Sequence, residues 1–528
     1  MMKNTSKVLN VALVLFSVIC WNNANAQGTL SDGSHWHWEK GTIVVETPQR
    51  PAGQTNVLNL TTPKLKVVRV GFVGTGGRGT GAVERWVNIP GVQIVAFCDH
   101  EKERAENCQQ FLKKAHLPEA AIYYGDSGYV ELCKRPDIDL VYIATDWLHH
   151  VPAALCAMNH GKHAAIEVPG ALNMKDIWDL INTSERTRKH CMLLENCVYD
   201  WFEMNTLSMA QKGLFGEILH VSGAYRHCLE QVWDLCWKKD KDDKLGWRLD
   251  YNMKHRGDVY PTHGLGPIAQ LLNIHRGDRM KTLVAMDTKA VTGKRLVKER
   301  TGQDVDFRNG DYTQTMIRTE NGKVIDVNHD TMDPEPYNRM YQLVGTKGFA
   351  NKYPSEGYAL SSAQMKKFGV TPSSDNFQGH DYLPAADKDA LVNKFYDPIL
   401  KKYGEMAKKV GGHGGMDFIM DCRLVYCLRN GLPLDIDVYD LAEWCCLTEL
   451  GALSMDNGNV PVTIPDFTRG HWNDIKGYSH AFVSDAEDAA TEKEAEEFTA
   501  NLKQGGETFL KKYWKTGNKK AAKSKKRK

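Results

Sequence analysis

The segment with the clearest chemistry is a glycine-rich turn, Gly74-Thr75-Gly76-Gly77-Arg78-Gly79. Gly74, Gly76 and Gly79 follow the G-x-G-x-x-G spacing that binds the pyrophosphate of a dinucleotide. In that pattern the first glycine permits a tight turn, the second lets the backbone approach the pyrophosphate, and the third allows close helix–strand packing. Gly77 and Arg78 lie inside the turn. We therefore expect it to bind a dinucleotide, with Arg78 either reaching a phosphate or pointing into solvent.

The residues on either side place this turn where the pattern requires it. Val67 to Val73 is a short apolar run that predicts a buried parallel strand, and helix-compatible residues follow the turn as far as Asn88. A second predicted strand, Val92 to Asp99, ends in an acid. Asp99 would accept hydrogen bonds from the adenosine ribose hydroxyls and repel a 2′-phosphate, which favours NAD over NADP. The alternative is a glycine-rich turn without a ligand.

Further strands and helices extend this pattern to residue 196. Because strands that alternate with helices indicate a parallel, doubly wound sheet, we expect residues 67–196 to form an NAD-binding Rossmann domain. The other predicted elements are strands at Leu140–Thr145, His163–Glu167 and Cys191–Glu195, with helices at Glu101–Ala115 and Ile177–Lys189.

After residue 196 the alternation of strands and helices ends. Several strand-like segments follow one another directly, as in a mostly antiparallel sheet. The predicted fold class is therefore α/β, a Rossmann sheet followed by an α+β substrate domain with an open sheet at 197–485 and a C-terminal helix and basic tail at 486–528. The predicted strands are Ile218–Tyr225, Thr282–Asp287, Thr313–Arg318, Val324–His329 and Tyr341–Val344, and the predicted helices are Phe202–Gln211, Asp417–Arg429, Asp440–Met455 and one beginning at Ala486–Glu497.

The N-terminus and the composition bear on location and partners. The chain has 528 residues and a formal charge of +2, which gives no sign of a nucleic-acid partner. Lys3 and Lys7 precede an apolar run, Val8 to Cys20, and Ala24-Asn25-Ala26 offers a cleavage site, so residues 1–26 are expected to be a secretory signal peptide. The absence of twin arginines favours Sec-type export to the periplasm. After cleavage we expect no membrane segment.

Residues 27–66 lack a clear periodicity, and we expect an extended N-terminal arm that packs over the later domains. His35-Trp36-His37-Trp38 offers two histidines without a complete ligand set, and the 13 cysteines include no Cys-x-x-Cys pair. We therefore expect no metal site, and buried free thiols rather than a redox motif.

Beyond the glycine-rich turn, several segments resemble the Gfo/Idh/MocA oxidoreductase superfamily (glucose–fructose oxidoreductase, inositol dehydrogenase and MocA), and within it glycoside hydrolase family 109, the NAD-dependent α-N-acetylgalactosaminidases. These segments occur in family order over roughly residues 67–350. They are Gly74–Gly79, Thr145–His150, Ile166–Pro169, Glu195–Tyr199, Gly223–His227, Tyr260–Gly264, His329–Thr331 and Pro336–Asn338.

One departure from the superfamily bears on the reaction. Its dehydrogenases usually carry Glu-Lys-Pro with a catalytic lysine, whereas this chain has Glu167-Val168-Pro169. Because valine cannot donate a proton, Val168 favours the hydrolase branch. The resemblance implies that NAD oxidises C3 of the sugar, the leaving group is eliminated, water adds, and the hydride returns. The alternatives are a sugar dehydrogenase that releases NADH and a sugar-binding protein without activity.

The resemblance also implies the residues of the sugar site. His263 is expected to be the base, since an ordinary histidine, with a pKa of about 6.5, suits proton transfer near neutrality. Tyr337 is expected to act beside it in catalysis or substrate contact. Tyr225, Arg248 and Tyr260 match substrate contacts of the family. Each has a structural alternative, such as a sheet aromatic or a local ion pair.

Residues on the nicotinamide side carry over in the same way, at the carboxyl ends of predicted strands, where open parallel sheets bind ligands. The substrate is expected to be a small-molecule or glycan-terminal sugar, and loops such as Trp233–Arg248 could redirect specificity. The oligomeric state stays open, a homo-oligomer included. The implied cofactor contacts are Trp147, His150, Glu167, Val168, Asn196 and Tyr260.

Overall fold

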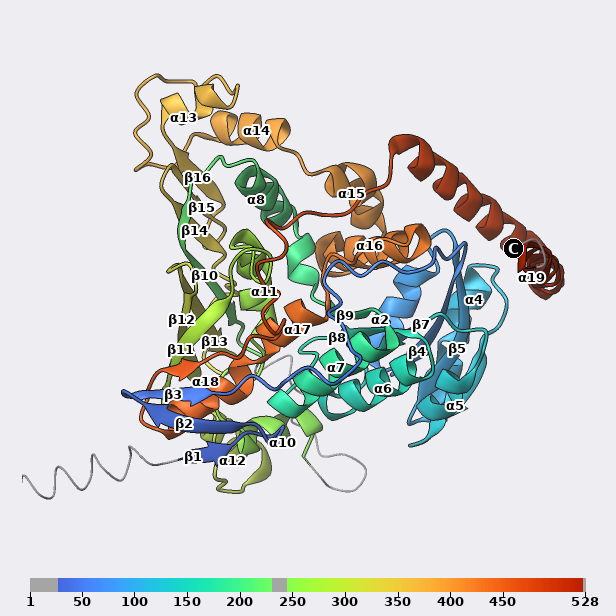
Figure 1. Ribbon diagram of the computed structural model, residues 1–528, viewed down its shortest axis with the longest axis horizontal. Coiled ribbons are helices and arrows are strands. Elements are labelled where there is room, and N and C mark those ends of the chain that lie inside the picture. The colour runs from blue at the N-terminus through green and yellow to red at the C-terminus, as the bar shows by residue number, and fades with distance from the viewer. Residues whose placement is uncertain (1–26, 230–244, 526–528) are drawn as a thin grey trace, which may run out of the picture.

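The structure, a computed structural model, describes residues 27–229 and 245–525. Two sheets organise these residues, a six-stranded sheet and an eleven-stranded sheet, with helices around and between them. In Figure 1 the smaller sheet lies at the right and the larger one runs along the left side. This arrangement confirms the predicted fold class. The predicted signal peptide, residues 1–26, lies outside the described residues.

The six-stranded sheet is parallel throughout and forms the core of the Rossmann domain. The five strands predicted for it are confirmed. The edge strand β6 was not predicted, because its four residues are half-buried or exposed and form no buried apolar run. In sheet order the strands are β6 Ala121–Tyr124, β5 Val92–Asp99, β4 Val68–Val73, β7 Leu140–Ile143, β8 His163–Glu167 and β9 Cys191–Leu194. The helices are α2 Gly77–Trp86, α3 Lys102–Asn107, α4 Gln109–Lys114, α5 Gly128–Lys134, α6 Trp147–Asn159 and α7 Met174–Thr187, with the short turn η1 Asn196–Tyr199.

The eleven-stranded sheet belongs mainly to the second domain and is mostly antiparallel, as predicted. Its parallel pairs are β10 with β13 and β17 with β3. In sheet order the strands are β1 Gln27–Thr29, β2 His35–Glu39, β3 Thr42–Val45, β17 Val462–Thr463, β11 Met280–Asp287, β12 Tyr312–Thr319, β13 Val324–Asp330, β10 Ile218–Arg226, β14 Gln342–Gly345, β15 Gly348–Asn351 and β16 Gly357–Leu360.

The N-terminal segment, for which an extended arm was expected, includes three strands of regular sheet. Strands β1, β2 and β3 form one edge of the larger sheet, and β3 pairs with β17 through Ile43 and Val462. The His35–Glu39 strand alternates half-buried tryptophans with exposed residues, a pattern of period two that five residues barely display. These histidines therefore belong to a strand at the sheet edge.

The four helices predicted after residue 196 are present, with one correction, whereas α10 to α15 were not predicted. The predicted helix Asp440–Met455 is two helices, which meet at Cys446. The helices are α8 Trp201–Gln211, α10 Trp247–Lys254, α11 Thr262–Leu271, α12 Thr292–Thr301, α13 Ser362–Lys367, α14 Ala385–Lys394, α15 Pro398–Val410, α16 Met416–Asn430, α17 Val438–Cys445, α18 Leu447–Asp456 and α19 Asp485–Lys525, with the turn η2 His413–Gly415.

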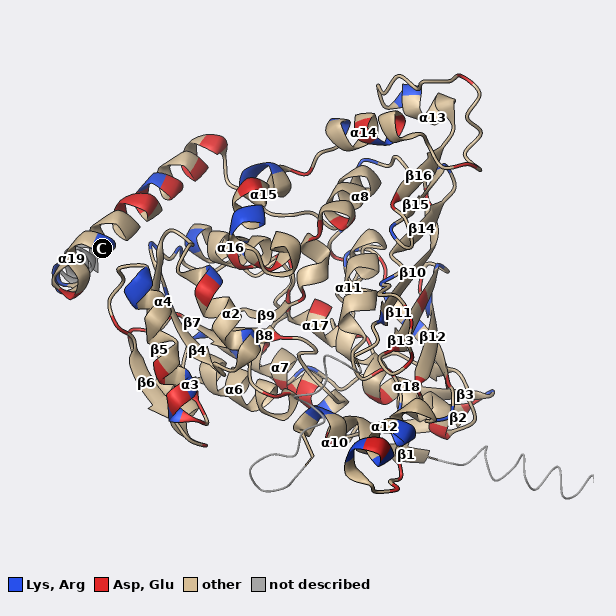
Figure 2. Ribbon diagram, turned by 180° about the vertical axis from the view of Figure 1, so that it is seen from behind, with Lys and Arg blue, Asp and Glu red and all other residues tan. Residues whose placement is uncertain are grey.

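The C-terminal helix α19 lies along the outside of the Rossmann domain and bends at Gly506 (Figure 1). Its buried residues Phe498 and Leu502 pack against Val67, just before the first Rossmann strand. Acidic residues predominate in its first part (Figure 2), whereas the charged residues after Glu507 are all lysines. Across the described residues, no helix is both long and apolar enough to span a membrane.

The contact between α11 and β10 positions the site. Gly223 of β10 and Gly264 of α11 meet so closely that a Cβ added to Gly223 would lie 2.0 Å from the Gly264 carbonyl oxygen. The helix therefore rests directly on the strand. His263, next to Gly264, is brought to the end of β10 that carries Tyr225.

Candidate active site

The glycine-rich turn joins β4 to α2 and has the shape of a pyrophosphate cradle. Gly74 has φ +88°, a conformation that favours glycine. A Cβ added to Gly79 would lie 1.9 Å from the Gly74 carbonyl oxygen, so this position cannot carry a side chain. A Cβ added to Gly77, in contrast, would meet no atom within 4 Å. The turn is thus closed on its inner side and open on its outer side, which fits a dinucleotide at the start of α2.

Asp99 lies at the carboxyl end of β5, beside this turn, as predicted from the sequence. It is buried, and its Oδ2 accepts a hydrogen bond of 2.7 Å from the Thr75 amide. Its Oδ1 accepts another of 3.0 Å from the Glu101 amide. These contacts hold the carboxylate against the turn, where an adenosine ribose would lie in a Rossmann domain.

Arg78 is about a third exposed and is bound by two carboxylates. Its Nε donates to Glu167 over 2.7 Å, and its Nη1 donates to Asp417 of α16 over 2.8 Å. The reason is charge: two buried carboxylates lie within reach, and an arginine can bind both. The contact of Arg78 with a phosphate stays a prediction. Glu167 also accepts a hydrogen bond of 3.0 Å from the Tyr142 hydroxyl.

Asp417 is the centre of a polar network that the sequence did not reveal. Its Oδ1 accepts a hydrogen bond of 2.6 Å from the side-chain amide (Nδ2) of Asn196, and its Oδ2 lies 2.9 Å from Nδ1 of His413. Burial alone would raise the pKa of Asp417, but the hydrogen bond with His413 and the charges of Arg78 and Arg85 hold it well below its usual range. Asp417 is therefore ionised and connects predicted cofactor contacts to the η2 turn.

The predicted nicotinamide-side residues Trp147 and His150 lie at the start of α6. Asp146 caps this helix by accepting a hydrogen bond of 3.0 Å from the Leu148 amide. His150 is buried, which lowers its pKa to about 4, and its Nε2 lies 3.1 Å from the Thr145 carbonyl oxygen. Trp147 instead faces the second domain, where its ring stacks on Tyr260 at 5.5 Å. Val168, after β8, is buried as well.

Arg248 completes this contact between the domains. Its guanidinium carbon lies 4.8 Å from the centre of the Trp147 ring and 5.1 Å from that of Tyr260. It comes from α10, at the end of the loop expected to influence specificity. Most of that loop, residues 233–244, lies outside the described residues.

The remaining predicted sugar-site residues form a continuous row of rings. Tyr225 lies 5.1 Å from both Tyr260 and His263, measured between ring centres. Its hydroxyl is 3.1 Å from Nδ1 of His227, and the His227 ring lies 4.8 Å from Tyr337. Tyr337 is 41% exposed at the open end of the row. Burial of its hydroxyl raises the pKa of Tyr337 well above its usual range, which keeps the group a hydrogen-bond donor.

His263 is held by a carboxylate whose role was not predicted. Nδ1 of His263 lies 2.8 Å from Oε1 and 2.9 Å from Oε2 of Glu195. Glu195 stands inside one of the segments that carry the family resemblance, but its partner is 68 residues away in the sequence. Spacing alone therefore gave no signal for this pair.

His413 is a second histidine that the sequence analysis missed. It lies in Gly411-Gly412-His413-Gly414-Gly415, whose four glycines all have positive φ. Its side chain is 60% exposed, and its charge acts on His227 of the sugar site. A histidine flanked by glycines on both sides is the signal that could have marked it, since glycine allows the backbone to approach a ligand closely.

Glu195, Cys197 and His263 bring possible ligand atoms within 4.8 Å of one another. The Cys197 sulfur lies 3.3 Å from Nδ1 of His263, and burial raises the pKa of this thiol well above its usual range. Because a zinc ligand must be a thiolate and Nδ1 already binds a carboxylate, we interpret the group as hydrogen-bonded rather than metal-binding.

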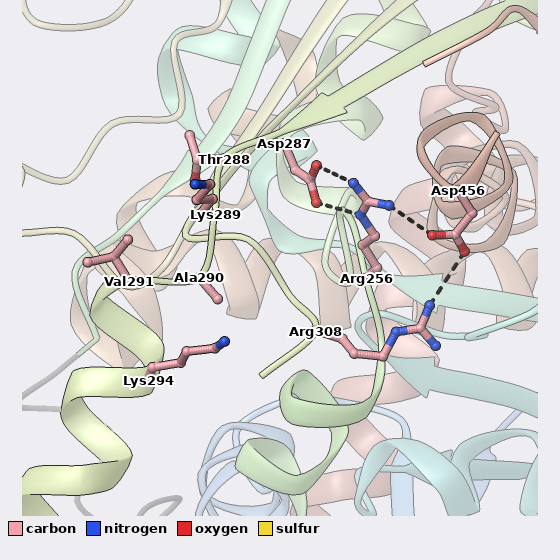
Figure 3. A pocket seen from close by; sticks show the side chains of 9 residues that line it. All are labelled: Arg256, Asp287, Thr288, Lys289, Ala290, Val291, Lys294, Arg308 and Asp456. Atoms are coloured by element: carbon pink, nitrogen blue, oxygen red, sulfur yellow. Dashed lines mark hydrogen bonds and ion pairs between the residues drawn. The ribbon is translucent and has the colours of Figure 1, made fainter. Parts of the chain in front are cut away.

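A hollow of about 520 Å³ lies on the second domain near the β11–α12 connection, away from these residues (Figure 3). Arg256 crosses it with bonds of 2.7 Å and 2.8 Å to Asp287 and one of 2.9 Å to Asp456. Asp287 and Asp456 thus compensate the positive charge of Arg256. None of the residues that line the hollow belongs to the predicted site.

Two family models match the chain. One, described as oxidoreductase family, NAD-binding Rossmann fold, matches residues 68–194. The other, described as glycosyl hydrolase 109, C-terminal domain, matches residues 199–474, which is more than half of the chain. The two matches meet between β9 and α8, where the Rossmann sheet ends.

Relatives of known family support these matches. The chain is 64% identical over 506 residues to glycosyl hydrolase family 109 protein 5 of Phocaeicola vulgatus, covering 95% of this chain and 97% of that protein. It is 61% identical over 443 residues to glycosyl hydrolase family 109 protein 1 of Bacteroides thetaiotaomicron, covering 84% and 93%. Among solved structures, levoglucosan dehydrogenase in complex with NADH has a TM-score of 0.55 at 19% identity, covering 76% of this chain and 99% of that one. This last likeness concerns the fold.

Proposed function

The chain belongs to glycosyl hydrolase family 109, and from that premise we propose that it removes terminal α-N-acetylgalactosamine from glycosides with a tightly bound, recycled NAD. The observation that supports this most is the position of His263. A buried carboxylate holds it, two tyrosines flank it, and it lies next to the predicted nicotinamide contacts. The valine at position 168 supports a hydrolase over a dehydrogenase, because it removes the usual catalytic lysine.

Residues of the second domain would activate the C3 hydroxyl of the sugar. With Nδ1 bound to Glu195, His263 has Nε2 available to accept the hydroxyl proton. Bound NAD would supply a reversible hydride transfer at C3, at the start and at the end of each turnover. Arg78, Asn196 and Trp147 would hold the cofactor, and Asp99 would bind its ribose.

A ketone at C3 makes the C2 proton acidic, so the glycosidic oxygen can be eliminated and water can add at C1. These steps need proton transfer on the C1–C2 side. His413 is suited to this, because Asp417 holds its Nδ1 while its side chain is exposed and its charge acts on His227. The Tyr337 hydroxyl, which stays protonated, would donate a hydrogen bond to a substrate oxygen.

The test is to incubate purified protein with a nitrophenyl α-N-acetylgalactosaminide without added NAD. We expect nitrophenol release over many turnovers and no net accumulation of NADH. Stoichiometric NADH would instead support the sugar dehydrogenase alternative. Loss of activity in His263→Ala, with cofactor content unchanged, would support the assignment of the base. Chelators are expected to leave the activity unchanged.

We also propose export to the periplasm through the predicted signal peptide, residues 1–26. A Sec route would deliver the chain unfolded, so NAD would have to bind after export. N-terminal sequencing of the protein from the periplasmic fraction tests this: a mature end at Gln27 supports it, and an intact Met1 in the cytoplasm contradicts it.

A further inference from the structure

Glu195 is a buried acid, and its hydrogen-bond partners among the described residues, Cys197 and His263, belong to the site. Its side chain is fully buried, and its Oε1 accepts a hydrogen bond of 2.9 Å from the Cys197 amide. Both oxygens also contact Nδ1 of His263. Burial alone would raise the pKa of Glu195, but the charge and hydrogen bond of His263 lower it below its usual value. Glu195 is therefore ionised while it contacts the imidazole.

The surrounding backbone fixes the position of this carboxylate. Glu195 follows β9 and caps the η1 turn, so its backbone belongs to the Rossmann domain. Gly266 lies on the same face of α11 as His263, three residues later. A Cβ added to Gly266 would lie 3.1 Å from Cγ of Glu195 and 3.0 Å from Trp444. The glycine therefore makes room for the carboxylate, which cannot turn away without displacing packed atoms.

An ionised carboxylate only accepts hydrogen bonds, so the proton of neutral His263 must lie on Nδ1. Nε2 then carries the lone pair. Other titratable or charged groups also lie near His263. They are Cys197 on η1, Tyr225 on β10, His227 just after β10 and Tyr260 before α11, with Arg248 of α10 behind the two tyrosines.

We propose that Glu195 is a positioning residue for catalysis: it fixes His263 as the Nδ1–H tautomer, aims Nε2 at the sugar, and sets the lowest pH at which the enzyme works. This inference rests on the proposed function, in which His263 is the base. It also places the two parts of one proton-transfer unit on different domains. The Rossmann domain supplies the carboxylate, and α11 of the second domain supplies the imidazole.

The first test reads the tautomer directly and requires no activity. Protein with ¹⁵N-labelled histidine is prepared as wild type, Glu195→Gln and Glu195→Asp, and the His263 ring signals are assigned by their loss in His263→Asn. We expect Nδ1–H with an unprotonated Nε2 in the wild type at neutral pH. Glu195→Gln, which keeps the shape but can also donate, should give a mixture of tautomers, and Glu195→Asp should restore the wild-type pattern.

The second test reads the pH dependence of kcat/KM on the nitrophenyl glycoside. Removing the negative charge in Glu195→Gln should shift the acidic limb to lower pH by about one unit or more and reduce the maximum about 10- to 100-fold. Glu185→Gln is the matched control, because Glu185 is also fully buried and bound to arginines, away from the site. Glu185→Gln should leave the acidic limb of the kcat/KM profile and the His263 tautomer unchanged even if it lowers the melting temperature.

Two results would overturn the proposal. One is a wild-type His263 with its proton on Nε2, and the other is Glu195→Gln with an unchanged tautomer and an unchanged acidic limb. A protein without glycosidase activity that still shows the tautomer change would contradict the proposed function while leaving the Glu195–His263 relationship intact. The NAD content of Glu195→Gln, which should equal that of the wild type, separates a positioning effect from loss of the cofactor site.

Discussion

Nη1 of Arg78 lies 2.8 Å from Oδ2 of Asp417, and this ion pair joins the glycine-rich turn of the Rossmann domain to the first turn of α16 in the second domain. Asp417 also contacts Asn196 and His413. A change on the cofactor side can therefore reach the exposed histidine through one carboxylate.

Arg78→Ala should weaken both the fold and cofactor binding. Removing Arg78 leaves Glu167 without a bound arginine and leaves Asp417 with Arg85 alone, at 3.5 Å. Breaking a buried pair costs about 3–5 kcal/mol, less here because Arg78 is about a third exposed. Thermal unfolding and NADH fluorescence titration measure the two effects. Arg135→Ala removes a more exposed pair with Asp137 and should change neither by much. An Arg78→Ala protein as stable as the wild type would contradict the network.

Gly79→Ala should abolish NAD binding, because the added Cβ would overlap the Gly74 carbonyl oxygen. Gly81→Ala is the control. Gly81 lies two residues later on α2, its added Cβ would lie 3.8 Å from Arg85, and this variant should bind NAD normally. Cofactor content of the purified variants is the measurement. Equal content in both would show that the turn does not cradle the pyrophosphate.

The activity that His413→Ala loses should depend on the leaving group of the substrate. If His413 protonates the glycosidic oxygen, a nitrophenyl substrate, which leaves readily as an anion, should keep activity within about tenfold of the wild type, whereas alkyl or serine-linked sugars should lose about 10²- to 10⁴-fold. Rates on the two substrate types measure this. Equal losses on both would remove the proton-donor role from His413.

Stability should fall in mild acid because several histidines are buried in the neutral form. Burial lowers the pKa of His190 to about 4, whereas an unfolded histidine has an ordinary pKa of about 6.5. Between these values the unfolded chain binds more protons, so this contribution is complete above pH 6.5 and is lost as the pH falls toward 4. The free energy of unfolding, measured with denaturant at several pH values, should depend less steeply on pH in His190→Gln than in the wild type. An unchanged slope would contradict the assignment.

Cys156 should be the first described cysteine to react with iodoacetamide near neutral pH. The hydrogen bond with Cys133 and the nearby His160 lower its pKa below the usual value of a thiol, despite partial burial. Burial instead raises the pKa of Cys445 to about 12. Peptide mass spectrometry after brief labelling should find Cys156 modified well before Cys445, and Cys156→Ser should lose the early label. The reverse order would contradict the prediction.

The Rossmann strands could be predicted because each buried parallel strand is a continuous apolar run, which the sequence displays locally. Strand β6 and the N-terminal strands could not, because they lie at sheet edges where only part of each strand is buried. Their pairing depends on residues far along the chain. The cysteine expectation held in most cases: the eleven described thiols are free, and all but Cys156 and Cys228 are buried.

Among the site residues, too, local spacing made some predictable, whereas others depend on contacts with distant parts of the chain. The glycine-rich turn and Asp99 follow from spacing within one βαβ unit, so their placement together was predictable. Arg78 was not, because its direction depends on Asp417, 339 residues later. Glu195 and His413 were missed for the same reason. Each acts through a contact that exists only after the two domains have packed together.

The pairing of β3 with β17 has a consequence for how the chain folds. The Val45 amide donates to the Thr463 hydroxyl, 418 positions later, and Ile43 pairs with Val462 beside it. The first described strands therefore have no edge to join until nearly all of the chain has emerged from the ribosome or the translocon. Such long-range contacts slow folding, since the loop must close before the contact can form. The edge of the large sheet is thus completed late, and a chain shortened at either end would leave it open to pairing with another molecule.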